Sequence, residues 1–191
     1  MVDYYDGGFT DVTVFMHDDG LFPWSKWRGS SAHTPFSNFT QLVDAIDKYQ
    51  EDFLHLGVHG FVKRDFFDDP FAGVVLQSIW PYLKSELVPK PPWELTFKPS
   101  AHMVVRKEAL YTRPKWVYQA LLQHARTSTD IWGIVDPARK FCCALENTWH
   151  ILFGQPAILP LKNLLTDRMI ADGLLTDFPH DKAWNGTHYY R

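Results

Sequence analysis

The chain has 191 residues, of which 46% are hydrophobic, 16% aromatic and 21% charged, which is typical of a globular protein with a sizeable core. Its 19 basic and 22 acidic residues leave a formal charge of −3, and no block of Lys or Arg provides the basic surface of a nucleic-acid-binding protein. We find no apolar run of about 18 residues and expect neither a signal peptide nor a membrane span, so the compartment is the cytoplasm as the chain stands, or a secretory lumen if an N-terminal region has been lost.

The first half of the chain is expected to hold one strong strand and two helices. Residues 11–17 form a nearly continuous apolar run, which predicts a strand buried on both faces. Residues 21–36, rich in Trp, Ser, Pro and Gly, form a loop long enough to act as a lid or a binding loop. Helices are expected at about residues 39–52 and 73–87, with Pro81 as a point of kinking or breakage in the second.

The second half is expected to contain two short strands and three helical segments. In chain order these are strand 93–97, strand 101–105, a helix that starts at Pro114, a helix at about 137–153 and a helical piece at about 161–171. Strands that alternate with helices favour the α/β class over an all-α fold. We expect one α/β domain over residues 1–156 and a helical or irregular C-terminal extension over residues 157–191.

The first candidate site is the cluster His17-Asp18-Asp19, which follows the best strand. In open α/β sheets, ligands bind outside the carboxyl ends of the strands, and hard divalent ions prefer oxygen ligands. His17 and Asp19 are therefore candidate metal ligands. The Asp-Asp-Gly sequence is also an ordinary turn sequence, so both interpretations stay open.

Arg106, His102 and Trp24 are further candidates for contacting a substrate. Arg106 ends the second of the short strands and could bind a phosphate or carboxylate in a bidentate manner, or form an ion pair with Glu108 or Asp136. His102 lies on the same strand, where a hydrogen-bonded core histidine is the common alternative. Trp24 belongs to the long loop after the first strand.

The second candidate site lies near the end of the helix expected at about 137–153. Read as helix, the sequence places Glu146, Trp149 and His150 at i, i+3 and i+4, which is one helix face. A carboxylate beside an aromatic wall can act as a general base, so Glu146 and His150 are candidate catalytic residues and Trp149 a candidate substrate contact. The same face could equally be a helix end at which Glu146 caps or bridges and Trp149 fills the core.

Four motifs resemble, in their order, those of a family of fungal, algal and bacterial proteins described as a domain of unknown function. They are T-V-F-M-H at residues 13–17, A-H-M-V-V-R at residues 101–106, R-P-x-x-V-Y at residues 113–118 and E-x-x-W-H-x-x-F-G at residues 146–154. The resemblance covers about residues 2–155. The last motif is the most specific, and Met103 and Val105 stand where the family tends to have Phe and Ser.

That family is similar to glycosyltransferases of the GT-A type, so the resemblance implies a three-layer α/β fold that binds a nucleotide sugar. By position, His17 and Asp19 would lie at a manganese or magnesium ion or at the diphosphate, and Glu146 would lie near the acceptor. Family members carry a further strand–helix region before the position of Val2. The resemblance therefore also implies a fold that is incomplete at its N-terminus.

We expect from this a glycosyltransferase-like protein that transfers a sugar from a nucleotide-sugar donor, with Glu146 accepting the proton of the acceptor hydroxyl. One alternative is a non-catalytic carbohydrate- or protein-binding domain derived from such an enzyme. A second is an unrelated metal-dependent enzyme that uses His17 with His102 or His150 as ligands. The expected partner is a nucleotide sugar or carbohydrate, and the sequence specifies neither the sugar, the acceptor nor the oligomeric state.

Overall fold

The structure is a computed structural model, and it describes residues 2–3, 5–16, 36, 39–56, 61–64, 72–92, 94–97, 102–127 and 137–174. Three of the expected site residues, His17, Asp19 and Trp24, lie outside these ranges.

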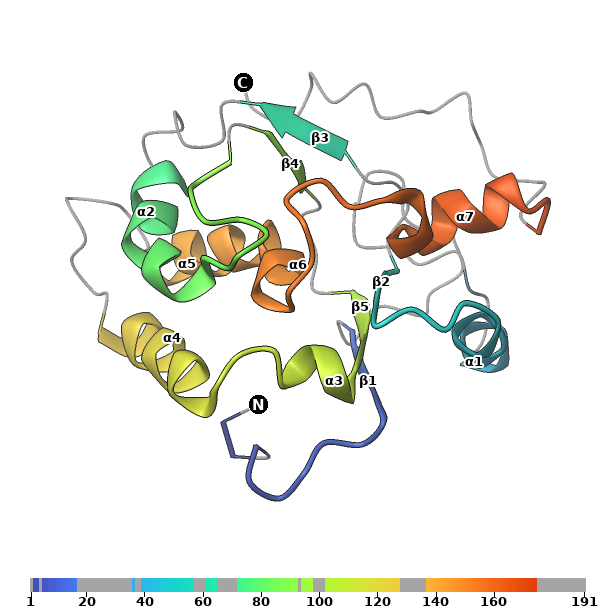
Figure 1. Ribbon diagram of the computed structural model, residues 1–191, viewed down its shortest axis with the longest axis horizontal. Coiled ribbons are helices and arrows are strands. Elements are labelled where there is room, and N and C mark those ends of the chain that lie inside the picture. The colour runs from blue at the N-terminus through green and yellow to red at the C-terminus, as the bar shows by residue number, and fades with distance from the viewer. Residues whose placement is uncertain are drawn as a thin grey trace.

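Within the described residues the chain forms a mixture of helices and strands, as the alternating pattern predicted (Figure 1). The strands are β1 (Val12–Phe15), β2 (Phe53–His55), β3 (Phe61–Arg64), β4 (Glu94–Phe97) and β5 (Met103–Arg106). The helices are α1 (Phe39–Lys48), α2 (Ala72–Leu83), α3 (Lys107–Leu110), α4 (Lys115–Thr127), α5 (Pro137–Glu146), α6 (Trp149–Leu152) and α7 (Leu165–Ala171), with a 3-10 turn, η3 (Leu161–Asn163), before α7.

A three-stranded sheet with β5 at its centre lies in the middle of the molecule. Its order is β1-β5-β2, and Val104 of β5 lies opposite Val14 on one side and Leu54 on the other. β3 and β4 form a separate pair. All three strand pairs of the described chain are antiparallel, so the rule that ligands gather at the carboxyl ends of parallel strands does not locate a site in these sheets.

β1 differs from its expected environment. Its apolar run predicted burial on both faces, but all four residues from Val12 to Phe15 are only half-buried. The reason is position, because β1 is an outer strand, whereas β5, which also has four residues, is the central one. An apolar run indicates that the side chains are sheltered from water. It does not indicate whether the strand lies at the centre or at the edge of its sheet.

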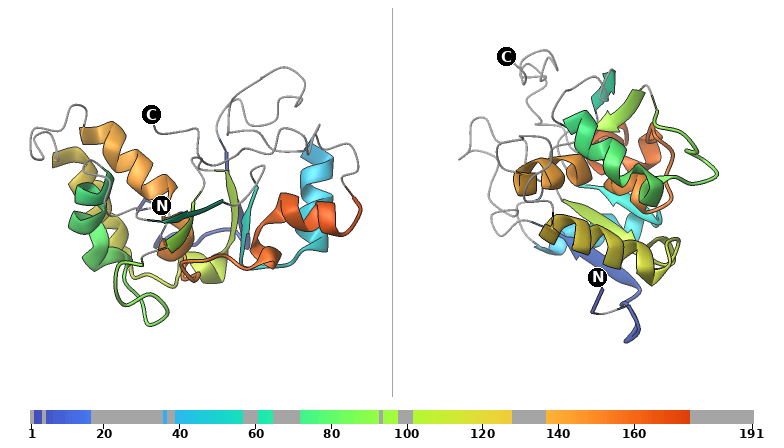
Figure 2. Two further views of the ribbon diagram at one scale, coloured as in Figure 1. Left: turned by 90° about the horizontal axis from the view of Figure 1, so that it is seen from above. Right: turned by 90° about the vertical axis from the view of Figure 1, so that its left-hand side faces the viewer.

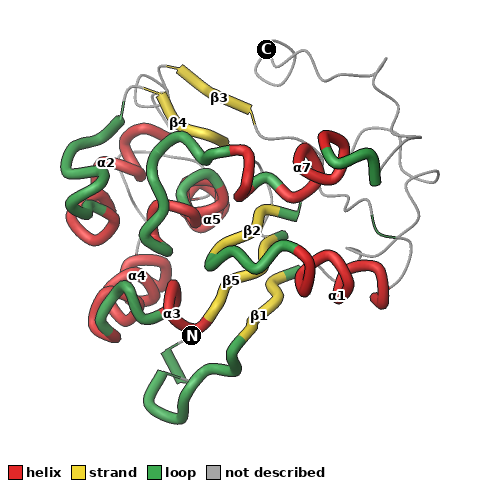
Figure 3. Tube along the Cα trace, turned by 45° about the vertical axis from the view of Figure 1, so that its right-hand side comes forward, coloured by secondary structure: helices red, strands yellow, loops and turns green. Residues whose placement is uncertain are grey.

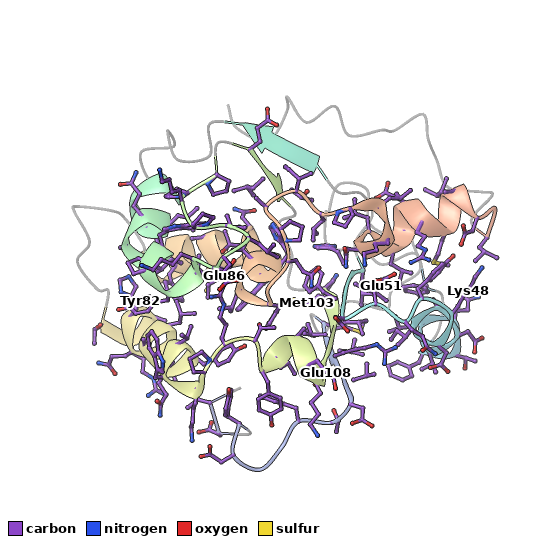
Figure 4. The ribbon with its side chains drawn as sticks, viewed as in Figure 1. Lys48, Glu51, Tyr82, Glu86, Met103 and Glu108 are labelled. Carbon is purple, nitrogen blue, oxygen red and sulfur yellow. The ribbon has the colours of Figure 1, made fainter. Side chains whose placement is uncertain are left out.

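Two cores lie on opposite faces of β5, because successive side chains of a strand point to opposite sides. Met103 and Val105 pack into a larger core with α2, α4, α5 and α6. Val104 packs into a smaller core formed mainly by residues of α1, β2 and α7. Figure 2 shows these two groups of helices on either side of the sheet, and Figure 4 shows Met103 near the centre of the molecule.

Most of the expected helices are present, with shifted ends. α4 begins directly after Pro114, as predicted from the first-turn preference of proline. α2 runs through Pro81 and ends at Leu83, so the proline is accommodated in the last turn of the helix. The helical piece expected at 161–171 forms η3 and α7, and α7 buries Leu165 and Met169 in the smaller core. Of the described helices, none is both long and apolar enough to cross a membrane.

Candidate functional site

The helix expected at 137–153 is interrupted at the candidate site. α5 ends at Glu146, Asn147 and Thr148 form a turn, and α6 begins at Trp149. The Thr148 hydroxyl donates to the carbonyl oxygen of Ala144 at 2.7 Å, and the Thr148 amide donates to Leu145 at 2.8 Å. Such local bonds compete with the regular helix ladder, so the chain changes direction at this position.

The prediction that Glu146, Trp149 and His150 share one helix face is therefore wrong. Glu146 is the last residue of α5, whereas Trp149 and His150 open α6. The three residues instead border a joint between two helices, in which Thr148 is completely buried and Glu146 is half-buried.

An aromatic stack connects α6 to the end of β1. The indole of Trp149 and the ring of Phe153 are stacked, with centroids 6.0 Å apart and planes at 12°. Phe153 stacks in turn on Phe15, at 6.2 Å and 19°. Phe15 is two residues before His17, so the structure places the α5–α6 joint close to the strand that leads to the expected metal ligands. Such offset stacks contribute about 0.5–1.5 kcal/mol per pair beyond the apolar area that they bury.

Two polar atoms at the joint are buried without a hydrogen-bond partner. They are the indole Nε1 of Trp149 and the side-chain Oδ1 of Asn147, a residue that is 3% exposed. Buried polar groups are nearly always hydrogen-bonded, because an unpaired one costs about 1–3 kcal/mol. One unpaired donor and one unpaired acceptor thus lie within three residues of the Glu146 carboxylate in sequence.

The imidazole of His150 is buried and hydrogen-bonded within the protein. Its ring is completely surrounded, and Nε2 lies 3.1 Å from the carbonyl oxygen of Ala157, which can only accept a hydrogen bond. Burial lowers the pKa of His150 to about 4, so the ring is neutral at pH 7 with its proton on Nε2. The same Ala157 oxygen accepts the Thr96 amide at 2.8 Å, so His150 joins α6 to β4.

Arg113 is the residue that the candidate-site reasoning missed. It is buried, and it donates to four backbone carbonyls: Leu83 and Lys84 at the end of α2, and Ile151 and Leu152 at the end of α6. Burial lowers the pKa of the guanidinium, and the carbonyls at the two helix ends carry the partial negative charge that offsets its own. Its place in the R-P-x-x-V-Y motif is the sequence feature that could have identified it.

The remaining candidates lie around the central sheet. Arg106 is half-buried at the end of β5, and its amide donates to the carbonyl of Asp52 at 2.8 Å. His102 precedes β5 and is completely buried, with its carbonyl accepting the Leu56 amide at 3.1 Å. In the part of the chain that the structure describes, no three His, Cys, Asp or Glu side chains converge as metal ligands. The proposed ligands His17 and Asp19 fall outside that part.

Comparison of the chain with protein-family models, with curated proteins and with solved structures gives no match.

Proposed function

We propose that the α5–α6 joint binds the hydroxyl groups of a sugar and that the chain is a glycosyltransferase-like protein acting on a nucleotide-sugar donor. The observation that carries the proposal is the pair of unpaired buried atoms beside Glu146. The Trp149 N–H would donate to a ligand oxygen, and Asn147 Oδ1 would accept a ligand O–H. Binding would satisfy both groups and recover the cost of burying them.

The proposed reaction transfers a glycosyl group to an acceptor hydroxyl. The hydroxyl oxygen forms a bond to the anomeric carbon, the bond from that carbon to the diphosphate breaks, and the diphosphate leaves with the electron pair. The half-buried Glu146 takes the hydroxyl proton as general base. A manganese or magnesium ion held by His17 and Asp19 would offset the charge of the diphosphate, as the family resemblance implies.

A non-catalytic carbohydrate- or protein-binding domain is the second candidate. The observation that favours it is the state of His150, which is neutral, enclosed and bonded to Ala157. Such an imidazole positions α6 but exchanges no proton with a substrate. Glu146 is then the sole base in the proposed reaction. A chain that keeps the sugar site but does not catalyse transfer would be a carbohydrate-binding domain.

The test is a thermal-shift screen of UDP- and GDP-sugars, with and without manganese, followed by assay of nucleoside diphosphate release. A donor at about a hundredfold above its dissociation constant stabilises the fold by about 2.7 kcal/mol. We expect Trp149→Phe to remove most of this stabilisation, because it keeps an aromatic ring and deletes the N–H. Trp116→Phe is the matched control, since Trp116 is 56% exposed on α4.

Glu146→Gln separates the two candidates. In a transferase it retains donor binding and abolishes diphosphate release, while Glu108→Gln on the exposed side of α3 leaves both unchanged (Figure 4). Stabilisation by free oligosaccharides without any diphosphate release would favour the binding domain. No stabilisation by any nucleotide sugar or oligosaccharide would refute the sugar site.

A further inference from the structure

β1 forms one edge of the three-stranded sheet. β1 is the first strand in the order β1-β5-β2, and no other described strand pairs with its outer side. Figure 3 shows β1 as the outermost strand of this sheet, with β5 and β2 both on the same side of it.

The hydrogen-bonding register identifies which backbone groups face that edge. The Lys107 amide donates to the carbonyl of Asp11 at 3.0 Å, so the pair formed by residues 11 and 107 is hydrogen-bonded. In an antiparallel pair such residues alternate along the strand, so Asp11, Thr13 and Phe15 point their backbone groups at β5. Val12 and Val14 therefore point theirs outward.

Three further hydrogen bonds agree with this alternation. On the far side of β5, the Arg106 amide donates to Asp52 and the Leu56 amide donates to His102, so residues 102 and 106 face β2. On the outer edge, the hydroxyl of Thr10 donates to the Val12 carbonyl at 2.8 Å, as an outward-pointing carbonyl allows.

The side chains of β1 do not protect the edge. Val12, Val14 and Met16 pack on the smaller core, Phe15 packs on the larger one, and no charged residue, proline or glycine occurs from residue 12 to 16. Natural edge strands are usually blocked by such residues, because an open edge recruits another strand. The Thr10 hydroxyl bonds the outward Val12 carbonyl, but the outward N–H groups of Val12 and Val14 define the occupant as an extended strand, and apolar side chains on that strand would match those of β1.

We propose that β1 pairs with β1 of a second copy of this chain, antiparallel across a twofold axis. The two three-stranded sheets then join as one continuous sheet, in the order β2-β5-β1-β1-β5-β2. β1 itself fits this description, since Val12 and Val14 lie on one face and Phe15 on the other, and an isologous contact uses the same residues from each copy. The edge is only four residues long, so the dimer is weak and its population depends on concentration.

Sedimentation velocity over a concentration series tests the pairing, with Val14→Pro as the blocking variant. Proline lacks the outward N–H, and it is tolerated on an edge strand where that N–H makes no sheet bond. We expect the wild type to approach twice the mass of one chain and folded Val14→Pro to stay monomeric. Thr13→Pro is the matched control, because the Thr13 N–H faces β5 and its loss lowers stability whether or not a dimer forms.

Hydrogen exchange on the wild type tests the pairing of β1 with a second copy even if Val14→Pro fails to fold. The Val14 amide should exchange at least about tenfold more slowly at concentrations where the dimer predominates, while Thr13 and Phe15 are protected at all concentrations. A chain that stays monomeric at its solubility limit would overturn the proposal. So would a Val14 amide that is protected in the monomer, or a folded Val14→Pro that still dimerises.

Discussion

α6 and α7 end in the same backbone geometry but in different surroundings. At each end a glycine has a positive φ, 78° at Gly154 and 70° at Gly173. The Gln155 amide donates to the carbonyl of His150, and the Leu174 amide donates to the carbonyl of Met169, both at 2.8 Å. This is the hydrogen bond of a Schellman motif at a helix C-terminus.

The two helices differ in what fixes them to the rest of the protein. α6 is joined to α2 by the buried Arg113 guanidinium, through neutral carbonyls and without a described carboxylate partner. α7 is joined to the segment that follows α1 mainly by charged groups near the surface: Arg168 lies 3.1 Å from Glu51, and the Asp172 carboxylate accepts the hydroxyl of Tyr49 at 2.6 Å. Figure 4 shows Lys48 and Glu51 at this side of the molecule. Burial, rather than the number of charges, should decide which connection contributes more stability.

The largest expected effect is that of Arg113→Met. It removes the donor of four hydrogen bonds to carbonyls at the ends of α2 and α6, three of them buried, so we expect the free energy of unfolding to fall by about 3–5 kcal/mol in urea. Arg126→Met near the exposed end of α4 is the control and should change it by less than about 0.5 kcal/mol. Equal effects of the two substitutions would contradict the role given to Arg113.

The next effect is a loss of stability in mild acid caused by His150. The unfolded imidazole binds a proton below about pH 6.5, whereas the buried ring stays neutral until about pH 4. The free energy of unfolding should therefore fall as the pH drops through this window, by about 3 kcal/mol in total. His150→Gln should flatten this dependence, while His124→Gln, at a part-buried ring, should leave most of it. A wild-type curve that is flat between pH 6.5 and 4 would exclude a buried neutral His150.

The paired substitutions Gly154→Ala and Gly173→Ala compare the two helix ends directly. Each places a side chain at a positive φ, which costs about 1 kcal/mol. At Gly154 the added Cβ would also lie 3.2 Å from Cγ2 of Thr112, whereas at Gly173 no atom lies within 4 Å. We expect losses of about 2 and about 1 kcal/mol in thermal unfolding. The reverse order would show that the end of α6 relaxes more freely than its burial suggests.

The smallest effect is expected from Glu51→Gln. Burial raises the pKa of the Glu51 carboxyl, but hydrogen bonds from Lys162 and Arg168 more than offset it, and the net pKa is lowered. Its contribution is thus present above the unfolded pKa near 4.3 and is lost as the pH falls through the lower folded pKa. At pH 7 we expect a loss of less than about 1 kcal/mol that mostly disappears in about 1 M salt. A salt-independent loss as large as that of Arg113→Met would reverse the comparison.

Local signals in the sequence predicted the elements better than their arrangement. Pro114 marked the start of α4, and the periodic residues of 39–52 marked α1, because both signals act within a few residues. The central place of β5 and the antiparallel pairing with β1 and β2 depend on contacts between distant segments. Apolar periodicity does not encode which strands meet, so it ranked residues 11–17 above the strand that is central.

The candidate site was predictable by residue type but not by geometry. Glu146 and Trp149 stood out because a carboxylate and an indole are rare neighbours in an apolar segment. The break between them arises from the Thr148 hydroxyl and its bond to Ala144, a competition that helical spacing ignores. Arg113 was missed because an arginine before a proline reads as a surface residue until the carbonyls of two helices surround it.

The stack of Trp149, Phe153 and Phe15 should give α6 a spectroscopic signal that can be followed in solution. An indole held at 12° to a neighbouring ring has a fixed asymmetric environment, which produces a near-ultraviolet circular dichroism signal. The far-ultraviolet signal depends instead on the backbone of all the helices. If α6 undocks while the other helices stay folded, the near-ultraviolet signal decreases and the far-ultraviolet signal is retained. The difference between wild type and Trp149→Phe would assign that band to α6, and so report local undocking in solution.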